Sequence, residues 1–395
     1  MKVLAIHRYY WPDTPPYASM LRAIVKQWVS DGHEVDVLSS QPSYKVGVEN
    51  KRQPRREEVD GAQVVRMGLP PESGRPLIRI LNALRLGAGI FWRAVIRKRY
   101  DVIMVSTSPP VLGGWFAAVA AKLSGARFIY HCMDIHPEIG RISGEFSNPK
   151  VFSLLCKLDS WACDHARPVV VLSQDMADTL TGRASGTIPD TVVINNFSLP
   201  SDADEVAELP FEWPKARFVL IFAGNIGRYQ GLDALIDAMI ALKSHPDIHL
   251  LMMGEGVERE RLTEKARQAG ANVTFAGHQS VQTAKAAMAR ASAGFVSLIP
   301  ELYRFAYPSK TMTYLEQGCP VLVAVEPASC LARDVVESGS GLAVPAGDAG
   351  ALSEALIKMA ESPERLSEMR QRALEFSSQA FATDVVLDRW SSLLK

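Results

Sequence analysis

The stretch FVLIFAGNIGRYQGLDALIDAMIALKSHPDIHLLMM, residues 218–253, holds a strand pattern, a helix pattern and a second strand pattern in direct succession. The apolar run over 218–222 predicts a buried strand, and a glycine-rich turn follows it at 224–231. Residues 232–242 then carry apolar side chains at helical spacing, and 249–253 form a second apolar run. This order predicts the βαβ unit of a parallel sheet, in which the loops after the strands meet at one edge.

The same alternation extends over most of the chain. Strand and helix patterns alternate from Lys2 to Asn196, and again from the quoted stretch up to Glu361. Between them, Ser201 to Pro214 is polar, acidic and bounded by prolines, as a linker is. We therefore predict an α/β protein of two Rossmann-like, doubly wound domains that face a central ligand cleft. The predicted bounds are 1–200 and 216–375 for the domains, 201–215 for the linker, and 376–395 for a C-terminal helix that crosses back to the first domain.

Composition excludes several classes of protein. The chain is 47% hydrophobic and 22% charged, an ordinary globular mixture. Its five cysteines are odd in number and form no CxxC pair, which argues against a disulfide framework or a zinc site and favours a reducing cytoplasm. No signal-peptide core or membrane-spanning run is recognised in the sequence, and we expect no nucleic-acid partner.

The charge is unevenly distributed along the chain. Residues 1–200 carry a net charge of +6, and the remainder carries −6. The basic half favours an anionic surface or substrate, although ordinary surface scatter would also explain a charge of this size.

The segment Pro308-Ser309-Lys310 is the sharpest candidate site. Proline precedes a predicted helix, Ser309 is placed to cap it, and Lys310 falls in its first turn. A lysine there opposes the helix dipole, and a bound phosphate would reverse that penalty. A solvated lysine is the competing interpretation.

Three glycine-containing loops of the second half are expected at the same edge. The turn at 224–231 allows backbone N–H groups to approach a phosphate, but its spacing is neither G-x-G-x-x-G nor a Walker loop. Gly254 and Gly256 follow the next strand, and His278 follows the one after. His278 is interpreted either as an exposed loop residue or as a contact to a nucleotide base.

The first half offers ionisable and aromatic candidates. Asp134, His136 and Glu138 follow the strand pattern over 128–131, and such groups could orient or deprotonate an acceptor hydroxyl. Helix and loop capping is the alternative. The loop over 9–18 is rich in aromatic residues, which either stack on sugar rings or pack within the loop.

These motifs together resemble those of the bacterial family 4 glycosyltransferases, which are retaining enzymes of the GT-B fold. The second half carries Gly224-Asn225-x-Gly227-x-x-Gln230-Gly231-Leu232, Gly254-x-Gly256, Pro308-Ser309-Lys310 and Gly341-Leu342-Ala343-Val344-Pro345. The first half agrees in Gly32-His33-Glu34-Val35, Thr107-Ser108-Pro109-Pro110 and Asp134-Ile135-His136-Pro137-Glu138. The closest subgroup is the one that builds O-antigen, capsule and colanic-acid-like polysaccharides.

The resemblance implies a nucleoside-diphosphate sugar donor, with UDP as the expected nucleotide, and a polyprenyl-diphosphate-linked saccharide acceptor. It implies no bound metal and no cofactor, since the nucleotide sugar is a substrate. The implied catalytic residues are Asp134, His136 and Glu138, and the implied acceptor-side residues are Tyr10, Tyr17 and Ser108. The implied donor-side residues are Gly224, Asn225, Gly227, Arg228, Gln230, Gly254, Gly256, His278, Ser309, Lys310, Thr313 and Glu316.

The chain departs from the family pattern in two places. Phe305 and Thr313 stand where the family has a Glu-x7-Glu pair, so that Glu301 or Glu316 would have to substitute for the ribose carboxylate. Asn225 and Gln230 also stand where many members carry an arginine and a lysine for the diphosphate. Arg228 and Lys310 are then the expected sources of positive charge.

The segment over 78–99 reads as a basic amphipathic helix with interfacial aromatic residues. With lipid-linked acceptors implied, we predict a cytoplasmic protein that associates peripherally with the inner face of the membrane. Packing of the apolar face into the core is the alternative. Two other functions stay open: a GT-B-fold UDP-sugar 2-epimerase, and a non-catalytic subunit of a polysaccharide assembly complex.

Overall fold

The computed structural model describes residues 1–13, 15–43, 52–70, 76–96, 100–142, 144, 146, 148–183, 188–198 and 209–395. The chain forms two compact units. Unit 1 comprises Met1–Asn195 and Val386–Lys395, and unit 2 comprises Asn196–Val385. Of the predicted linker, residues 201–208 lie outside the described part, as do residues 97–99 of the predicted basic helix.

The described part of unit 1 contains an eight-stranded sheet in the order β3-β4-β2-β1-β5-β6-β7-β8. All neighbours are parallel except β3 and β4, which pair antiparallel at one edge. The strands are β1 (Lys2–Ile6), β2 (Glu34–Ser40), β3 (Arg56–Val59), β4 (Ala62–Met67), β5 (Val102–Ser106), β6 (Arg127–Cys132), β7 (Val169–Val171) and β8 (Thr191–Val193).

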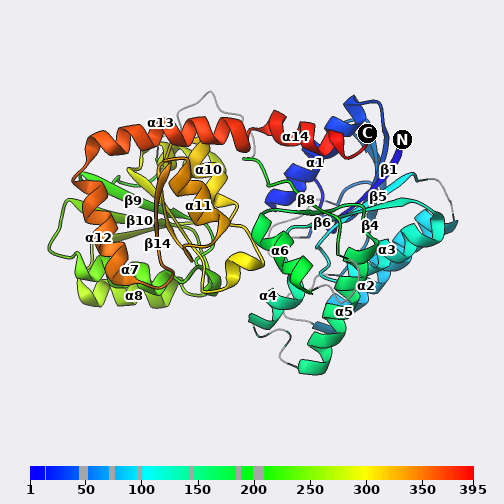
Figure 1. The fold of residues 1–395 in the computed structure, drawn as a ribbon, viewed down its shortest axis with the longest axis horizontal. Helices are drawn as coiled ribbons and strands as arrows, with labels where there is room; N and C mark the ends of the chain where they lie inside the picture. Colours follow the sequence, from blue (N-terminus) through cyan, green and yellow to red (C-terminus); the bar gives the residue numbers. More distant parts are fainter. Residues whose placement is uncertain are drawn as a thin grey trace. The chain divides into compact units, whose positions relative to one another are not determined.

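Helices pack against this sheet in the manner of a doubly wound domain. In Figure 1, α2, α3 and α5 lie side by side, whereas α1 packs against β2 and β4. The helices are α1 (Pro16–Ser30), α2 (Pro76–Phe91), η1 (Trp92–Ile96), α3 (Leu112–Ser124), α4 (His136–Ile142), α5 (Pro149–His165) and α6 (Gln174–Arg183). The last part of α14 (Thr383–Ser392) also belongs to unit 1, where the Trp390 ring meets the Trp28 ring edge-on.

Unit 2 is built on a six-stranded parallel sheet in the order β11-β10-β9-β12-β13-β14. Its strands are β9 (Phe218–Ala223), β10 (Ile248–Met253), β11 (Val273–Gly277), β12 (Ala293–Ser297), β13 (Val321–Ala324) and β14 (Gly341–Val344). Its helices are η2 (Arg228–Gln230), α7 (Leu232–Ala241), α8 (Arg259–Ala269), α9 (Val281–Arg290), η3 (Leu302–Arg304), α10 (Lys310–Glu316), α11 (Cys330–Glu337), α12 (Ala349–Ala360) and α13 (Pro363–Ala380).

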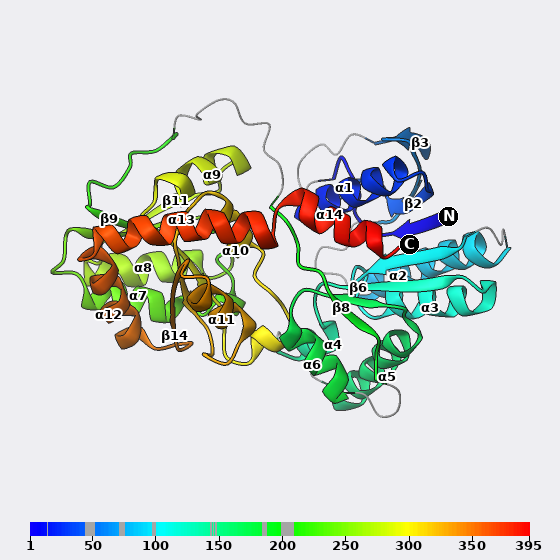
Figure 2. The ribbon, with the colours of Figure 1, turned by 45° about the horizontal axis from the view of Figure 1, so that its top comes forward.

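The helices of unit 2 form two packed groups. One group is α12, α7 and α8, whose apolar side chains bury a continuous core against the strands. The other consists of α9, α10 and α13, in which α10 contacts both of the other helices (Figure 2). The strands of this sheet all run parallel, so their carboxyl ends lie at one edge. The loops after β9, β10, β12 and β13 therefore come together at that edge.

The predicted fold class of two doubly wound α/β sheets is confirmed. The predicted helix over 78–99 differs in detail, because it begins at Pro76 and changes to a π-helical turn at Trp92–Ile96. The antiparallel strand β3 was not predicted from the sequence, because its residues Arg56–Val59 are mostly charged and form no apolar run. Among the described helices, none is long and apolar enough to cross a membrane.

Candidate functional site

At the carboxyl edge of unit 2, the loop after β9 packs directly on the loop after β10. The backbone N–H of Gly224 donates to the carbonyl of Met253 at 2.9 Å. A Cβ on Gly254 would stand 1.8 Å from the carbonyl oxygen of Gly224, and a Cβ on Gly256 would stand 2.2 Å from that of Ile226. Gly254 and Gly256 therefore allow two backbones to meet, which is a structural reason for both glycines whether or not a ligand binds.

Helix α10 brings Lys310 to the end of β9. Its Nζ lies 3.8 Å from the ring centroid of Phe222 and 3.6 Å from the position that a Cβ on Gly224 would occupy. Gly224 has a φ of +145°, which residues with a side chain rarely adopt. The glycine-rich turn and the lysine, which lie far apart in the sequence, thus meet in the structure.

The Nζ of Lys310 is buried and has no hydrogen-bond partner among the described residues. Burial lowers the pKa of this ammonium to about 7, because the charged form loses its hydration. The alternative of a solvated lysine is therefore wrong. An unpaired buried cation is costly, and an anion placed beside it would remove that cost and raise its pKa.

Ser309 is the N-cap residue of α10, as predicted, but its side chain does not cap the helix. Its φ and ψ of −59° and −22° are helical, and its side chain makes no capping hydrogen bond. A side-chain cap usually needs an extended backbone at that residue, so that the hydroxyl can reach back to the N–H groups of the first turn.

Tyr314, one turn further along α10, anchors the helix to β9. Its hydroxyl accepts a hydrogen bond from the backbone N–H of Ala223 at 2.8 Å and lies 3.3 Å from the carbonyl of Ile221. Gly294 makes room for the ring, since a Cβ there would stand 2.6 Å from it. Nothing in the local sequence around Tyr314 predicts this role. Its anchoring role depends on a contact between residues 91 positions apart.

The side chains of Asn225 and Gln230 converge over Gly227. A Cβ on Gly227 would stand 2.7 Å from the Nδ2 of Asn225 and 3.2 Å from the Oε1 of Gln230. The Gln230 Oε1 is buried and has no hydrogen-bond partner within the part of the chain that the structure describes, while the Gln230 carbonyl accepts from the Ser297 hydroxyl. These three predicted donor-side residues therefore form one polar cluster on the loop after β9.

Three other predicted donor-side residues lie on η2, on the loop after β11 and in α10. Arg228 has a side chain that is 77% exposed, with its Nε 3.6 Å from Glu258. His278 is exposed on the loop after β11, and Thr313 is half-buried in α10.

Neither proposed replacement for the missing glutamates is free. Glu316 accepts hydrogen bonds from the Lys285 ammonium at 2.8 Å and from the Ser198 hydroxyl at 2.6 Å. Glu301 pairs with Arg304 at 3.0 Å on the surface. The structure thus gives both carboxylates a role that needs no ligand.

In unit 1, Asp134 follows β6 by two residues and lies just before α4. Burial raises the pKa of its carboxyl, and the neighbouring His136 partly offsets that rise. The Nδ1 of His136 is buried, and none of the described residues offers it a hydrogen bond. A carboxylate with a raised pKa is a stronger base, so this pair has the chemistry to orient or deprotonate a hydroxyl.

Glu138 is held in a network of charges. Both of its carboxylate oxygens lie 3.1 Å from the Arg183 guanidinium, which also pairs with the buried Asp159. Asp159 in turn accepts from the Tyr130 hydroxyl at 2.9 Å. This network joins α4, α5, α6 and β6, so that Glu138 has a clear structural role, and its catalytic role stays a prediction.

The predicted acceptor-side tyrosines are largely inside unit 1. Tyr17 is 6% exposed, and its hydroxyl shares a 2.8 Å hydrogen bond with the Nδ1 of His131. Tyr10 is 1% exposed. The carbonyl of Ser108 accepts from the backbone N–H of Arg8 at 3.3 Å, which places the loop after β5 beside the loop after β1. Burial favours loop packing as the role of both tyrosines.

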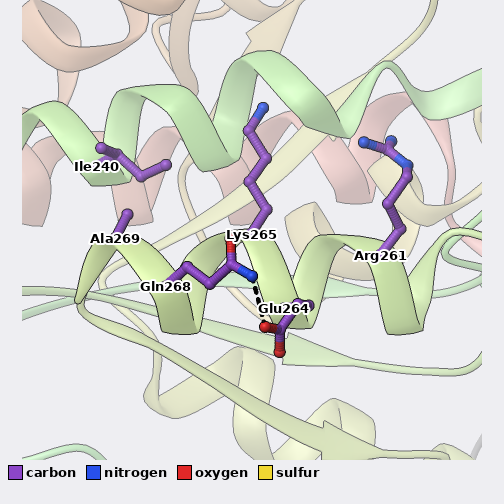
Figure 3. A pocket seen from close by; sticks show the side chains of 6 residues that line it. All are labelled: Ile240, Arg261, Glu264, Lys265, Gln268 and Ala269. Atoms are coloured by element: carbon purple, nitrogen blue, oxygen red, sulfur yellow. Dashed lines mark hydrogen bonds between the residues drawn. The ribbon is translucent and has the colours of Figure 1, made fainter.

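A surface hollow in the described part of unit 2 lies elsewhere. It measures about 590 Å³ and lies between α7 and α8, where it is lined by Ile240, Arg261, Glu264, Lys265, Gln268 and Ala269 (Figure 3). Arg261 pairs with Asp233 at 2.6 Å and Lys265 with Asp237 at 2.7 Å. Because its cations are already neutralised, this hollow is a poorer anion site than the buried Lys310.

No group of three His, Cys, Asp or Glu side chains is placed to hold a metal ion within the residues that the structure describes.

Two protein-family models match the chain in succession. The glycosyl transferase 4-like domain matches residues 17–196, and the model described as glycosyl transferases group 1 matches residues 207–376. Together they span most of both units.

Curated relatives agree with these models. The chain is 25% identical over 363 residues to the putative colanic acid biosynthesis glycosyl transferase WcaI of Escherichia coli (strain K12), covering 87% of this chain and 88% of WcaI. It is 24% identical over 295 residues to the probable glycosyltransferase WbjE of Pseudomonas aeruginosa, covering 73% and 72% of the two chains.

Solved structures share the fold over the whole length. Sucrose-phosphate synthase from Thermosynechococcus elongatus superposes with a TM-score of 0.73 at 16% identity, covering 100% of this chain and 98% of that one. Anabaena HepE in complex with UDP superposes with a TM-score of 0.70 at 17% identity, covering 100% and 99%. Both likenesses show the fold.

Proposed function

The chain belongs to the group 1 glycosyltransferases, and from this premise we propose that it transfers a sugar from a UDP-sugar to a lipid-linked saccharide in cell-surface polysaccharide synthesis. The family is retaining and uses nucleotide-sugar donors, and the fold is GT-B. Four points of the proposal go beyond the family: the nucleotide, the acceptor, the residues of the site and the contact with a membrane surface.

The buried, unpartnered ammonium of Lys310 carries the proposal for the donor. It faces the gap that Gly224 leaves at the end of β9, and within the described residues it has no hydrogen-bond acceptor. A diphosphate oxygen in that gap would pair with the ammonium and remove the cost of its burial. We assign Lys310 and Gly224 to the donor diphosphate.

The same ammonium serves the chemistry. When the bond between the sugar and the diphosphate breaks, negative charge accumulates on the leaving phosphate. A cation that is already in place, in a site with little water, stabilises that charge more than a solvated one would. The amide side chains of Asn225 and Gln230 lie on the same loop and are assigned to hydrogen bonds with the donor.

Asp134 is assigned to the acceptor hydroxyl. Its raised pKa makes it a better proton acceptor than an ordinary carboxylate, and His136 beside it supplies a second polar group. We keep Glu138 as a candidate with less support, because Arg183 already occupies both of its oxygens.

UDP is proposed as the nucleotide by analogy. Anabaena HepE, which shares the fold, has structures with UDP and with UDP-glucose. At 17% identity this likeness does not extend to the sugar, and we propose none.

A membrane-bound acceptor is supported by the exposed face of α2 and η1. This face is apolar, whereas Ala83, Leu86, Ile90 and Ala94 are the residues that pack inward. Trp92 is 60% exposed, and Arg79 and Arg85 are exposed on the same helix. Its exposed apolar residues are Leu77, Ile80, Leu81, Leu84, Phe91, Trp92 and Ile96.

The alternative that this helix merely packs its apolar face into the core does not account for the second apolar face. Apolar side chains beside arginines are typical of helices that lie in the interface of an anionic membrane. We propose that α2 and η1 rest on such a surface, where a lipid-linked acceptor would be found.

Incubation of the purified chain with UDP-, GDP- and dTDP-sugars, with and without a polyprenyl-diphosphate-linked saccharide, tests the proposed function. Transfer of the sugar only when the lipid acceptor is present is the expected result. Conversion of a UDP-sugar to its 2-epimer without acceptor would instead identify an epimerase. Failure to bind any nucleotide sugar would contradict the proposal and favour a non-catalytic subunit.

A further inference from the structure

Glu326 lies at the carboxyl edge of unit 2, two residues beyond the end of β13. Its Oε1 accepts a hydrogen bond from the backbone N–H of Glu301 at 2.6 Å. Its Oε2 is buried, and no residue in the described part of the chain donates a hydrogen bond to it. The sequence offered no signal for this residue, because nothing in its neighbours marks it as part of a site.

Other carboxylates of these loops are neutralised. Glu255 pairs with Arg259 at 3.3 Å, Glu301 with Arg304, and Glu316 with Lys285. Glu326 differs from them because its one recorded partner is a backbone N–H, which leaves half of the carboxylate without a donor. A carboxylate oxygen that is buried without a donor is costly, and a hydroxyl group placed beside it would remove that cost.

Backbone hydrogen bonds connect this carboxylate to the donor loop. The N–H of Ile299 donates to the carbonyl of Tyr229 at 2.9 Å, and the N–H of Leu298 donates to that of Ala324 at 3.3 Å. The loop after β12 therefore lies between the glycine-rich turn and Glu326. The unpartnered Oε1 of Gln230 stands on that turn.

We propose that the Oε2 of Glu326 accepts a hydrogen bond from a hydroxyl group of the nucleotide-sugar donor. This inference rests on the proposed function, since it presupposes that a nucleotide sugar binds unit 2. The unpaired groups of this edge have matching chemistry: the Lys310 cation suits the diphosphate, and the acceptor oxygens of Gln230 and Glu326 suit hydroxyls.

The carboxylate is held in place before the donor arrives. The bond from Glu301 fixes one oxygen, and the Glu326 carbonyl accepts from both the backbone N–H of Ser329 at 2.9 Å and its hydroxyl at 2.7 Å. Glu301 itself has a φ of +68°, so that the loop presents its N–H from a conformation that must be held by its surroundings. A carboxylate fixed in this way loses little rotamer entropy when a hydroxyl binds.

Two parts of the donor carry suitable hydroxyls, namely the ribose and the transferred sugar. The substitution Glu326→Gln distinguishes the loss of a hydrogen bond to the donor from a structural effect. The glutamine keeps a carbonyl oxygen for the Glu301 N–H, but it presents an amide group in place of the second acceptor. The matched control is Glu264→Gln, which changes a glutamate on the exposed face of α8.

Calorimetry of the full chain with UDP, UDP-glucose, UDP-galactose and UDP-N-acetylglucosamine is the test. In Glu326→Gln we expect Kd to rise about 10- to 100-fold, the range for losing a hydrogen bond to a charged group, with no change in Glu264→Gln. A rise for UDP as well as the UDP-sugars assigns the ribose. A rise for the UDP-sugars alone assigns the transferred sugar. Both outcomes support the inference.

An unchanged Kd in a folded Glu326→Gln, when the wild-type chain binds a UDP-sugar, would overturn the inference and leave the proposed function intact. Absence of binding by the wild-type chain would overturn both. If Glu326→Gln does not fold, Glu326→Asp takes its place, since it keeps the charge and withdraws both oxygens by one methylene. A Kd for that variant equal to the wild-type value would equally overturn the inference.

Discussion

The hydroxyl of Tyr314 accepts a hydrogen bond from the backbone N–H of Ala223 at 2.8 Å, and this contact helps to join α10 to the end of β9. Ala223 immediately precedes Gly224, and Lys310 lies one turn before Tyr314. The contact therefore contributes to holding the glycine gap and the ammonium, the two halves of the proposed diphosphate site, beside each other.

Replacing Tyr314 by phenylalanine should weaken both stability and donor binding. The ring still fits, but the N–H of Ala223 loses its partner in a buried position, at a cost of about 1–3 kcal/mol. Denaturant unfolding measures the loss of stability, and calorimetry with the donor measures the change in Kd. A Tyr314→Phe variant with wild-type stability would show that the hydrogen bond contributes nothing measurable.

Lys310→Met should have opposite effects on stability and function. In the free chain it replaces an unpaired buried ammonium by an apolar group of similar length, so that thermal stability should stay equal or increase. Donor affinity or kcat should fall about 100-fold or more, because the charge that faces the diphosphate is lost. Lys358→Met, on the exposed side of α12, is the matched control. Unchanged kinetics in Lys310→Met would remove this residue from the site.

The pH dependence of donor binding should report the same lysine. Its pKa of about 7 in the free chain means that at pH 8 the amine is mostly neutral, and a bound diphosphate would raise that pKa. Binding at pH 8 should then take up close to one proton, and affinity should fall by up to about tenfold per pH unit above pH 7. Calorimetry in buffers of different ionisation enthalpy counts the protons. Equal uptake in wild type and Lys310→Met would contradict the assignment.

The free chain should also gain stability as the pH rises above 7. A lysine whose folded pKa is lowered binds fewer protons when folded than when unfolded between about pH 7 and its ordinary value near 10.5. The free energy of unfolding should therefore rise with pH in that window, by up to about 1.4 kcal/mol per unit from this group. The difference between wild type and Lys310→Met, followed by denaturant titration, isolates it from other groups. The difference should shrink as pH increases.

Asp134→Asn should reduce kcat and leave nucleotide affinity unchanged. The asparagine keeps the size of the side chain but cannot accept a proton, and general-base contributions are typically about 100- to 10,000-fold. Because the wild-type pKa is raised by burial, activity should fall with decreasing pH at a higher value than for an exposed aspartate. Activity equal to wild type in Asp134→Asn would shift attention to His136 or Glu138.

Charge placed on the apolar face of α2 should release the chain from lipid. Ile80 and Leu84 are 51% and 48% exposed, so that Ile80→Glu with Leu84→Glu should not disturb the core. Sedimentation with vesicles of phosphatidylglycerol and phosphatidylcholine should fall several-fold, because each glutamate adds repulsion and removes buried apolar area. Val336→Glu, on an exposed site of α11, should bind vesicles as wild type does. Equal sedimentation of all three would exclude this face.

The fold and the family could be read from the chain because their signals are local. Apolar period, glycine turns and the order of strands and helices lie within windows of about ten residues, and these are enough to predict two parallel-sheet domains. Asn225, Gly227 and Gln230 are close in sequence as well as in space, so their grouping was also within reach. Strand β3 escaped because it is short and its residues Arg56–Val59 are mostly charged.

Burial and partners, in contrast, belong to the packed molecule. From its place at the start of a helix, Lys310 would be expected to be solvated. Its Nζ is buried because α10 packs on β9, which places the ammonium over the ring of Phe222. In the sequence, Glu316 is a candidate for binding the ribose, but in the structure Lys285 of α9 already pairs with it. Glu326, in contrast, has one carboxylate oxygen that receives no hydrogen bond from the described residues. Residue identity and spacing therefore settled what chemistry this chain carries and on which loops. Which of those groups are neutralised and which still need a ligand follows from contacts between distant segments, because desolvation depends on everything that surrounds an atom.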